Sequence, residues 1–208
     1  MEQCDQIQSV SKHMGVPELL RYLIKERFPG KTVVTASLRA PSIVVLKMVS
    51  NIDPSTPIIF CQRPPVFVES LGFRTEIAEK LGLTNVLMTE GHETRITPGD
   101  RDHCERMWVH YLDMPGRSFE ILHLNDCLAP YSCWISAVYH MHEPNPAASL
   151  NRVDVDGRLL KINPLLRWTK DDVRDFMSAN KLPFHKLAAR KFSYDETNAG
   201  EVYPTYHF

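Results

Sequence analysis

The fold is decided by the stretch Lys31-Thr-Val-Val-Thr-Ala-Ser-Leu-Arg-Ala-Pro-Ser-Ile-Val-Val-Leu-Lys-Met-Val-Ser50. Its β-branched run at 32–35 is typical of a buried strand, and the amphipathic run at 42–50 predicts a helix. Small residues at 36–42 predict a tight turn between them. Such a turn directs backbone N–H groups and the positive end of the helix toward one point, which suits a phosphate or sulfate group.

The turn has no glycine, although glycine is the usual residue where a backbone approaches an anion closely. Arg39 lies there instead. Two interpretations stay open. Arg39 either adds a charge-assisted contact to a bound anion, or it lies in solvent or fills the space that a ligand would use.

The rest of the chain alternates short apolar strands with helices, which predicts an α/β fold of three layers with a mostly parallel sheet of five or six strands. Further strands are predicted at 58–61, 85–88, 119–122 and 133–138, with a hairpin at 153–162. Further helices are predicted at 16–27, 67–81, 100–112 and 170–179, the last one capped by Thr169. We expect one domain over 1–190, an irregular tail at 191–208, and core positions at Trp134, Leu165, Leu166 and Trp168.

Composition narrows the classes of function. The formal net charge of -1 gives no reason to expect a nucleic acid or an anionic membrane as partner. No apolar run approaches the ~20 residues that span a bilayer, and the polar N-terminus does not resemble a secretory signal. Five cysteines with irregular spacing do not indicate a disulfide framework. We therefore expect a cytoplasmic protein that binds a small molecule.

Ligands of open α/β sheets bind at the carboxyl ends of the strands, which brings together the segments at 37–42, at 61–64 and after 138. Cys61 is the candidate nucleophile, because Arg63 could favour its thiolate. The alternative is an inert cysteine at a strand end. Arg63 is a second candidate phosphate contact, or a surface charge braced by two prolines. Cys127 and Cys133 are expected in the core or in loops, and Cys4 in a mobile terminus.

Several stretches, in this order, resemble the sulfonucleotide reductases, which reduce adenylyl sulfate or phosphoadenylyl sulfate (PAPS) and belong to the adenine-nucleotide α-hydrolase (PP-loop) superfamily. They are Thr35-Ala-Ser-Leu-Arg-Ala-Pro-Ser-Ile-Val-Val, Ile52-Asp-Pro-Ser-Thr-Pro-Ile-Ile-Phe, Cys133-Trp-Ile-Ser-Ala-Val and the run from Asp156-Gly-Arg-Leu-Leu-Lys-Ile-Asn-Pro to Val173, continued by Leu182-Pro-Phe-His-Lys-Leu. The resemblance implies a Rossmann-like, adenine-nucleotide α-hydrolase-like fold, an adenine nucleotide as ligand, a homodimer and a place in sulfate assimilation.

The resemblance also suggests ligand contacts, position by position. The family's first loop looks like Ser-Phe-Gly-Ala-Gln-Ser; Ser37 and Ser42 match it, Leu38 replaces the aromatic residue and Arg39 the glycine. The family's second strand ends in Leu-Asp-Thr-Gly, and neither its acid nor its glycine is present here. Basic residues follow the family's strand at Trp134. Together with Arg63, the expected phosphate-binding residues are Ser37, Leu38, Arg39, Ser42, Tyr139 and His140.

Two departures concern the chemistry. The reductases attack sulfur with a cysteine in a C-terminal Glu-Cys-Gly-Leu-His motif, whereas no cysteine follows Cys133 here, so we expect the usual catalytic cysteine to be absent. The adenylyl sulfate branch holds an iron–sulfur cluster with four cysteines, of which only Cys104 has a counterpart. One thiolate does not hold a four-iron cluster, and we therefore expect no iron–sulfur cluster in this protein.

A histidine pair offers an alternative chemistry. His140 and His142 alternate and would share one face of a strand, so they could bind a metal together with His185 or His123. The simpler interpretation is a pair without metal, whose partial protonation favours an anion. We expect no metal site.

The residue patterns and the family resemblance together leave three alternative candidate functions. The first is a diverged reductase-type protein that binds an adenylyl nucleotide or a related phosphorylated or sulfated ligand. The second is a non-catalytic binding or regulatory protein on the same scaffold. The third is an ATP-dependent adenylating or sulfur-transfer enzyme, which is the least favoured because Arg39 and Pro41 replace the glycines of a pyrophosphate loop.

Overall fold

A computed structural model describes residues 2–62, 68–95, 117–121, 124–137, 151–156 and 158–185. The helices of this part are α1 (Glu2–Ser11), α2 (Val16–Arg21), the π-helix η1 (Tyr22–Arg27), α3 (Ala40–Ile52), α4 (Val68–Leu81), α5 (Leu124–Leu128) and α6 (Lys170–Ala179). The strands are β1 (Thr32–Ala36), β2 (Ile58–Gln62), β3 (Val86–Arg95), β4 (Arg117–Ile121), β5 (Cys133–Ile135), β6 (Val153–Asp156) and β7 (Leu159–Ile162).

The described strands form one seven-stranded sheet in the order β4-β3-β2-β1-β5-β7-β6. The five inner strands are parallel to one another, whereas the edge strands β4 and β6 run antiparallel to β3 and β7. This arrangement confirms the α/β class with a mostly parallel sheet. The expectation was about five or six strands, and the described sheet has seven when the edge strand β4 is included.

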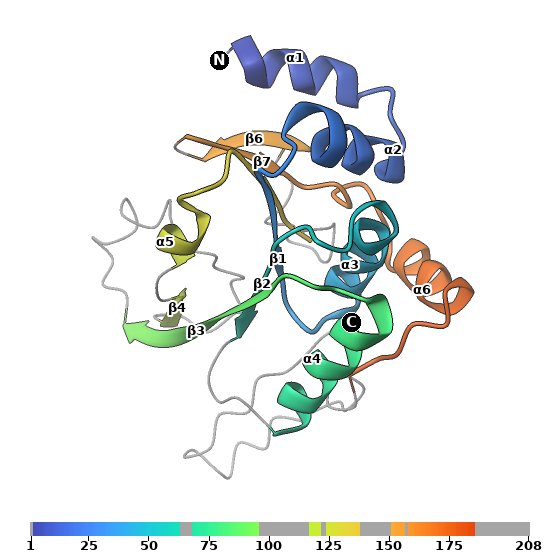
Figure 1. Ribbon diagram of the computed structural model, residues 1–208, viewed down its shortest axis with the longest axis vertical. Coiled ribbons are helices and arrows are strands. Elements are labelled where there is room, and N and C mark those ends of the chain that lie inside the picture. Colours follow the sequence, from blue (N-terminus) through green and yellow to red (C-terminus); the bar gives the residue numbers. More distant parts are fainter. Residues whose placement is uncertain are drawn as a thin grey trace.

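Two apolar layers sandwich the sheet. Val34 and Ala36 of β1 belong to the larger core cluster, which also takes buried side chains from α1, α2, α3, α4 and α6. Val33, which directly precedes Val34, belongs to a smaller cluster with Leu124 and Leu128 of α5. This is the alternation of faces that a strand imposes. Figure 1 shows α3, α4 and α6 on one side of the sheet and α5 on the other.

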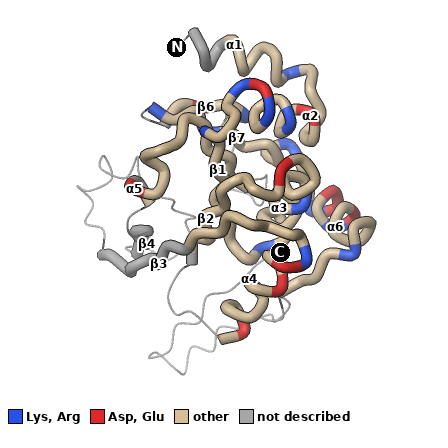
Figure 2. Tube along the Cα trace, viewed as in Figure 1, with Lys and Arg blue, Asp and Glu red and all other residues tan. Residues whose placement is uncertain are grey.

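The predicted strand and helix around the first turn are confirmed. All five residues of β1 are buried, as expected for a β-branched strand between two neighbours. The helix α3 begins at Ala40, two residues earlier than predicted, with Pro41 in its first turn. The strands β1 and β2 carry no charged residue, and Figure 2 shows the charged residues of this region on the surrounding helices and turns.

Several boundaries differ from the prediction. The helix predicted at 16–27 changes to a π-helix after Arg21, and the Phe28 N–H accordingly donates to the Leu23 carbonyl at 2.9 Å. β3 extends to Arg95 because β4 pairs with its second half. The helices α1 and α5 were not predicted. Cys4 lies within α1, whereas the predicted helix at 100–112 and the tail at 191–208 lie outside the described residues.

The hairpin and the helix cap predicted in the second half are confirmed. β6 and β7 form the expected hairpin. Thr169 caps α6 in a capping box, in which its Oγ1 accepts the Asp172 N–H and the Asp172 carboxylate accepts the Thr169 N–H at 2.7 Å. Trp134 and Leu165 are buried in the core, while Leu166 and Trp168 are half-buried.

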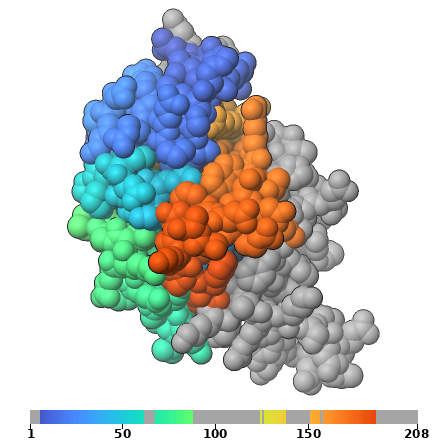
Figure 3. Space-filling view, turned by 90° about the vertical axis from the view of Figure 1, so that its right-hand side faces the viewer, coloured from blue at the N-terminus to red at the C-terminus, as the bar shows by residue number. Residues whose placement is uncertain are grey.

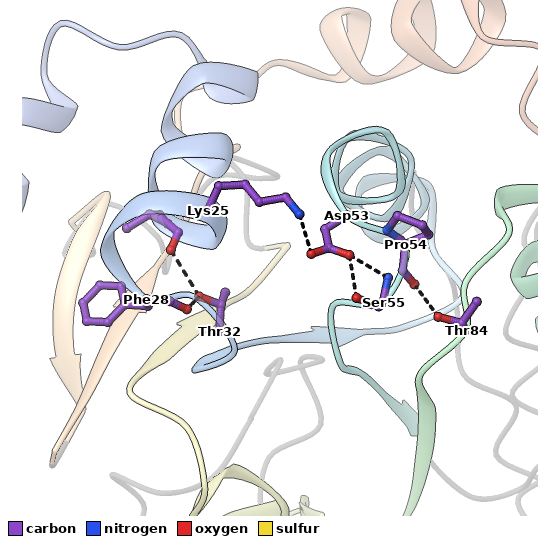
Figure 4. A network of polar contacts seen from close by, with 8 residues as sticks. Lys25, Phe28, Thr32, Asp53, Pro54, Ser55 and Thr84 are labelled. Atoms are coloured by element: carbon purple, nitrogen blue, oxygen red, sulfur yellow. Dashed lines mark hydrogen bonds and ion pairs between the residues drawn. The ribbon is translucent and has the colours of Figure 1, made fainter.

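A polar network fixes the amino-terminal edge of the sheet (Figure 4). The Lys25 ammonium lies 2.7 Å from the Asp53 carboxylate, which also accepts the Ser55 N–H and hydroxyl. At the start of β1, the Thr32 hydroxyl donates to the Phe28 carbonyl. Of the described helices, none has both the length and the apolar character that crossing a membrane demands.

Candidate functional site

The strand order places a switch point beside β1. β1 pairs with β2 on one side and with β5 on the other, and all three run parallel. The chain therefore leaves neighbouring strands in opposite lateral directions, which is where open α/β sheets bind ligands outside the carboxyl ends of their strands. The described segments that leave the sheet there are 37–39 after β1 and 136–137 after β5.

The two serines of the first turn bond to each other. The Ser37 N–H donates to Ser42 Oγ at 3.0 Å, and the two hydroxyl oxygens also lie 3.0 Å apart. The Arg39 N–H donates to Ser37 Oγ at 3.3 Å. Ser42 is only 3% exposed. The hydroxyl of Ser42 therefore holds the shape of the turn, and the N–H groups of Ser37 and Arg39 are engaged within it.

Arg39 lies in the turn without backbone strain. It is the N-cap of α3, with φ -89° and ψ 154°, a conformation open to every L-residue. The first N–H groups of a helix have no intrahelical acceptor. Since Pro41 has no N–H, Ala40 and Ser42 present the donors at this helix end, which favours a nearby anion. The two interpretations of the Arg39 side chain stay predictions.

Leu38 anchors the turn to the protein interior. Its half-buried side chain packs against the core cluster on the α3 side of the sheet. This contact explains why an apolar residue stands in the turn. A contact of Leu38 with a ligand stays a prediction.

A buried polar network lies where β5 and β7 end. The Ser136 hydroxyl donates to Asn163 Oδ1 at 2.6 Å, and the Ser136 N–H donates to the Ile162 carbonyl at 2.9 Å. Asn163 Nδ2 donates to the Asn151 carbonyl at 2.8 Å. Ser136 and Asn163 are both fully buried. Sequence reasoning missed this pair, although polar residues directly after two apolar strands were an available signal.

A second buried contact ties β1 to β5 and β7. Trp134 Nε1 donates to Thr35 Oγ1 at 2.7 Å, and Lys161 Nζ lies 4.5 Å from the centroid of the Trp134 ring. These residues come from three adjacent parallel strands. Thr35 lies two residues before Ser37, so the contact fixes the end of β1 from which the turn departs.

Three cysteines, Cys61, Cys127 and Cys133, have described side chains, and they lie in or beside apolar clusters. Cys61 is 7% exposed, its Sγ lies 3.8 Å from the Ile59 carbonyl oxygen, and it belongs to the cluster under α5. Burial raises the pKa of the Cys133 thiol to about 12 despite an opposing hydrogen bond with Thr32. Cys127 is half-buried. Burial of this kind disfavours a thiolate, and the role of Cys61 as nucleophile stays a prediction.

Several residues of the predicted sites lie outside the described residues. They are the expected phosphate contacts Arg63, Tyr139 and His140, the histidines His123 and His142 of the possible metal set, and Cys104. His185 is 8% exposed and meets the Phe73 ring edge-on at 5.0 Å. Its burial lowers its pKa, against an opposing effect of Glu69. Within the described ranges, no three His, Cys, Asp or Glu side chains are grouped so that they could hold a metal ion.

Comparison with known proteins places this geometry in a family. The sequence profile of the phosphoadenosine phosphosulfate reductase domain matches residues 31–194. The chain belongs to the phosphoadenosine phosphosulfate reductase family. The matched range begins one residue before β1 and includes the turn, the switch point and the buried network of Ser136 and Asn163.

Relatives and a solved structure agree with the family. The chain is 28% identical over 178 residues to the adenosine 5'-phosphosulfate reductase of Chelativorans sp. (strain BNC1), covering 85% of this chain and 71% of the relative. The corresponding enzyme of Mesorhizobium japonicum is also 28% identical, with 85% and 68% covered. The phosphoadenylyl-sulfate reductase from Candida auris, solved as a phosphate complex, has the same fold, with a TM-score of 0.60 at 16% identity and 90% of each chain covered.

Proposed function

We propose that this member of the phosphoadenosine phosphosulfate reductase family binds an adenylyl nucleotide that carries sulfate or phosphate. The anionic groups bind at the turn between β1 and α3. The observation that carries the proposal is the position of this turn, because it joins the N-terminus of a 13-residue helix to the switch point of the sheet. The names of the relatives support adenylyl sulfate and phosphoadenylyl sulfate as first ligands to test, within sulfate assimilation.

The proposal is confined to binding, because the described thiols do not favour attack on sulfur. Cys61 and Cys133 are buried and Cys127 is half-buried. A thiolate needs a cationic or exposed environment. If the protein reduces the bound sulfate with a thiol of this chain, Cys61 is a candidate near the turn, since Phe60 pairs with Ala36 at the end of β1, whereas Cys133 pairs with Thr32 at its start.

A non-catalytic binding protein is the second candidate. It is favoured by the mutual hydrogen bond of Ser37 and Ser42, which engages the two hydroxyls that the family resemblance assigns to the ligand. An ATP-dependent adenylating or sulfur-transfer enzyme is the third, and ATP is therefore included among the ligands below.

A thermal-shift panel tests the binding. The probes are adenosine 5'-phosphosulfate, phosphoadenosine phosphosulfate, adenosine 3',5'-bisphosphate and ATP, with adenosine as the uncharged control. A ligand at about 100 times its Kd adds ~2.7 kcal/mol to the free energy of unfolding, which raises the Tm by roughly 5–10 °C for a chain of this size. Ser42→Ala should reduce the shift, whereas Ser50→Ala, near the other end of α3, should not. No rise with any charged probe contradicts the proposal.

Catalysis needs its own assay. We expect sulfite release from the bound sulfated nucleotide, with a dithiol reductant present, only if a thiol of the chain attacks sulfur. Comparing the wild type with Cys61→Ser and Cys127→Ser separates the candidates. Activity that survives in both variants excludes these two thiols, and no activity in the wild type leaves the non-catalytic candidate ahead.

We also propose a cytoplasmic homodimer without an iron–sulfur cluster. The family resemblance supports the dimer, and the single cysteine counterpart at Cys104 supports the lack of a cluster. Light scattering after size exclusion tests the dimer. Iron analysis of protein purified without oxygen tests the lack of a cluster.

A further inference from the structure

A groove lies between α2, α3 and α6, on a surface that the proposed nucleotide site does not use. Its volume is about 330 Å³, and Figure 3 shows this face, where α2, α3 and α6 meet. It is lined by Pro17, Glu18, Arg21, Met48, Asn51, Ile52, Phe176 and Asn180. The residues from α3 belong to its last turn, whereas the nucleotide is proposed at the start of this helix.

The inner part of the groove is apolar. Met48 is 4% exposed and Ile52 is half-buried. Phe176 is held in place by Trp168, which it meets edge-on with 5.8 Å between the ring centroids. The volume is at the lower end of the ~300–1,000 Å³ found for ligand pockets, so the groove suits a small ligand with an apolar part.

Internal hydrogen bonds orient the two amide side chains of the rim. Lys47 Nζ donates to Asn51 Oδ1 at 2.9 Å, which leaves Asn51 Nδ2 as a donor toward a ligand. Asn180 Nδ2 donates to the Phe176 carbonyl at 2.9 Å, which leaves Asn180 Oδ1 as an acceptor. Beyond these two bonded atoms, the rim offers Asn51 Nδ2 as an amide donor and Asn180 Oδ1 as an amide acceptor.

The rim of the groove also carries one acidic and one basic side chain, Glu18 and Arg21. Glu18 and Arg21 lie three residues apart on α2, and neither forms an ion pair with another described residue. α3 and α6 also end here, at Ile52 and Ala179. The C-terminal end of a helix carries a partial negative charge, so these ends and Glu18 together attract a cation.

We propose that the groove binds a small zwitterion, an α-amino acid with an apolar side chain. The ammonium group is received by Glu18 and Asn180 Oδ1, and the carboxylate by Arg21 and Asn51 Nδ2. The side chain lies on Met48 and Phe176. This pairing of one donor set and one acceptor set around an apolar floor distinguishes a zwitterion from a simple anion or cation. The proposal does not depend on the nucleotide site.

L-norleucine is the probe, because its unbranched apolar side chain suits a narrow floor. We expect 10 mM L-norleucine to raise the Tm of the full-length wild type by about 3 °C, the shift for a ligand near ten times its Kd. Hexanoate lacks the ammonium group and norleucine methyl ester lacks the carboxylate, so neither should raise the Tm by more than a third as much. Calorimetry should give one binding site per chain.

Two variants locate the site. Glu18→Gln and Arg21→Gln should each abolish the shift, because each removes the partner of one charged group while leaving an exposed side chain in place. Glu26→Gln and Lys12→Gln are matched controls outside the groove and should keep it. The proposal is overturned by no shift in the wild type, by equal shifts with hexanoate or the ester, or by a shift that survives in both groove variants or disappears in the controls.

Discussion

Ser42 shows how a residue with a ligand-binding pattern also holds local structure. Its hydroxyl accepts the Ser37 N–H at 3.0 Å inside a buried turn. Ser42→Ala leaves this N–H without its acceptor, so we expect the free energy of unfolding to fall by about 1–2 kcal/mol, measured by urea unfolding. Ser50→Ala, which removes a half-buried hydroxyl bonded to the Lys47 carbonyl, should cost less. Equal losses in both variants would contradict a special role for Ser42.

Thr35 provides a sharper test, because Val has nearly its shape. Thr35→Val removes the acceptor of the Trp134 Nε1–H bond and leaves a buried donor unpaired. We expect a loss of about 1–3 kcal/mol in urea unfolding. Thr35→Ser keeps the hydroxyl and loses one methyl group, so its smaller loss should come from packing alone. A change in Trp fluorescence of the folded state should accompany only the valine variant.

Asp53 makes stability depend on pH. A hydrogen bond from Lys25 is the largest cause that lowers its pKa to about 2, below the 3.8 of the unfolded chain. A lowered carboxyl pKa adds stability that is complete above about pH 5, well above the unfolded pKa, and is lost as the pH falls toward 2. Lys25 is 45% exposed, which limits the expected contribution to about 1 kcal/mol.

Asp53→Asn checks this contribution. The variant should be less stable than the wild type at pH 6, and the difference should shrink when urea unfolding is repeated at pH 2.5. Asp175→Asn is a suitable control, because the ion pair of Asp175 with Arg174 is strongly exposed on both sides. A stability difference for Asp53→Asn that is the same at both pH values would exclude the ion pair as its source.

At the residue scale, the sequence shows which residues occupy the first turn and not how they bond. Ser37, Arg39 and Ser42 were placed correctly at the end of β1, since the β-branched run and the small residues set that position. Their mutual hydrogen bonds depend on turn geometry, which no residue pattern specifies. Ser136 and Asn163 were missed because these residues lie 27 positions apart in the sequence and meet only through the pairing of β5 with β7.

At the scale of elements, the clearest sequence signal was the start of α6. Its capping box satisfies the Thr169 and Asp172 N–H groups reciprocally. Thr169→Ala should lower the free energy of unfolding by ~1 kcal/mol in urea unfolding. Thr75→Ala lies inside α4, where alanine is the better helix former, and should be neutral or slightly stabilising. A loss in Thr75→Ala as large as that in Thr169→Ala would contradict the capping argument.

Element boundaries were predicted where side chains set them and missed where tertiary pairing sets them. Thr169 and Pro41 are local signals: α6 begins directly after Thr169 as predicted, and α3, with Pro41 in its first turn, begins two residues before its predicted start. β3 runs to Arg95 only because β4 pairs with it, and that pairing has no local signature. The change to a π-helix after Arg21 likewise shifts the hydrogen-bond register without altering the apolar periodicity.

For the whole molecule, one helix joins the two proposed sites. α3 begins at the turn proposed to bind the anion and ends at the groove, and its residues from Pro41 to Leu46 are all buried. The alternation of strands and helices predicted the parallel sheet, because only crossover helices connect parallel neighbours. The order of the strands follows from which helix packs on which face, so the position of the switch point became known only from the structure.

This sheet order predicts how stability is distributed. β1 lies between two parallel neighbours and is fully buried, whereas β6 is an edge strand whose Val155 is 56% exposed. We expect the amides of β1 to exchange with solvent hydrogen only through global unfolding, and those of β6 through smaller openings. In Thr169→Ala, the protection of the β1 amides should therefore fall by the full loss in unfolding free energy, about tenfold for 1.4 kcal/mol, while protection in β6 should change little. Mass spectrometry of exchanged peptides measures both, and an equal fall in β1 and β6 would show that the sheet opens as one unit.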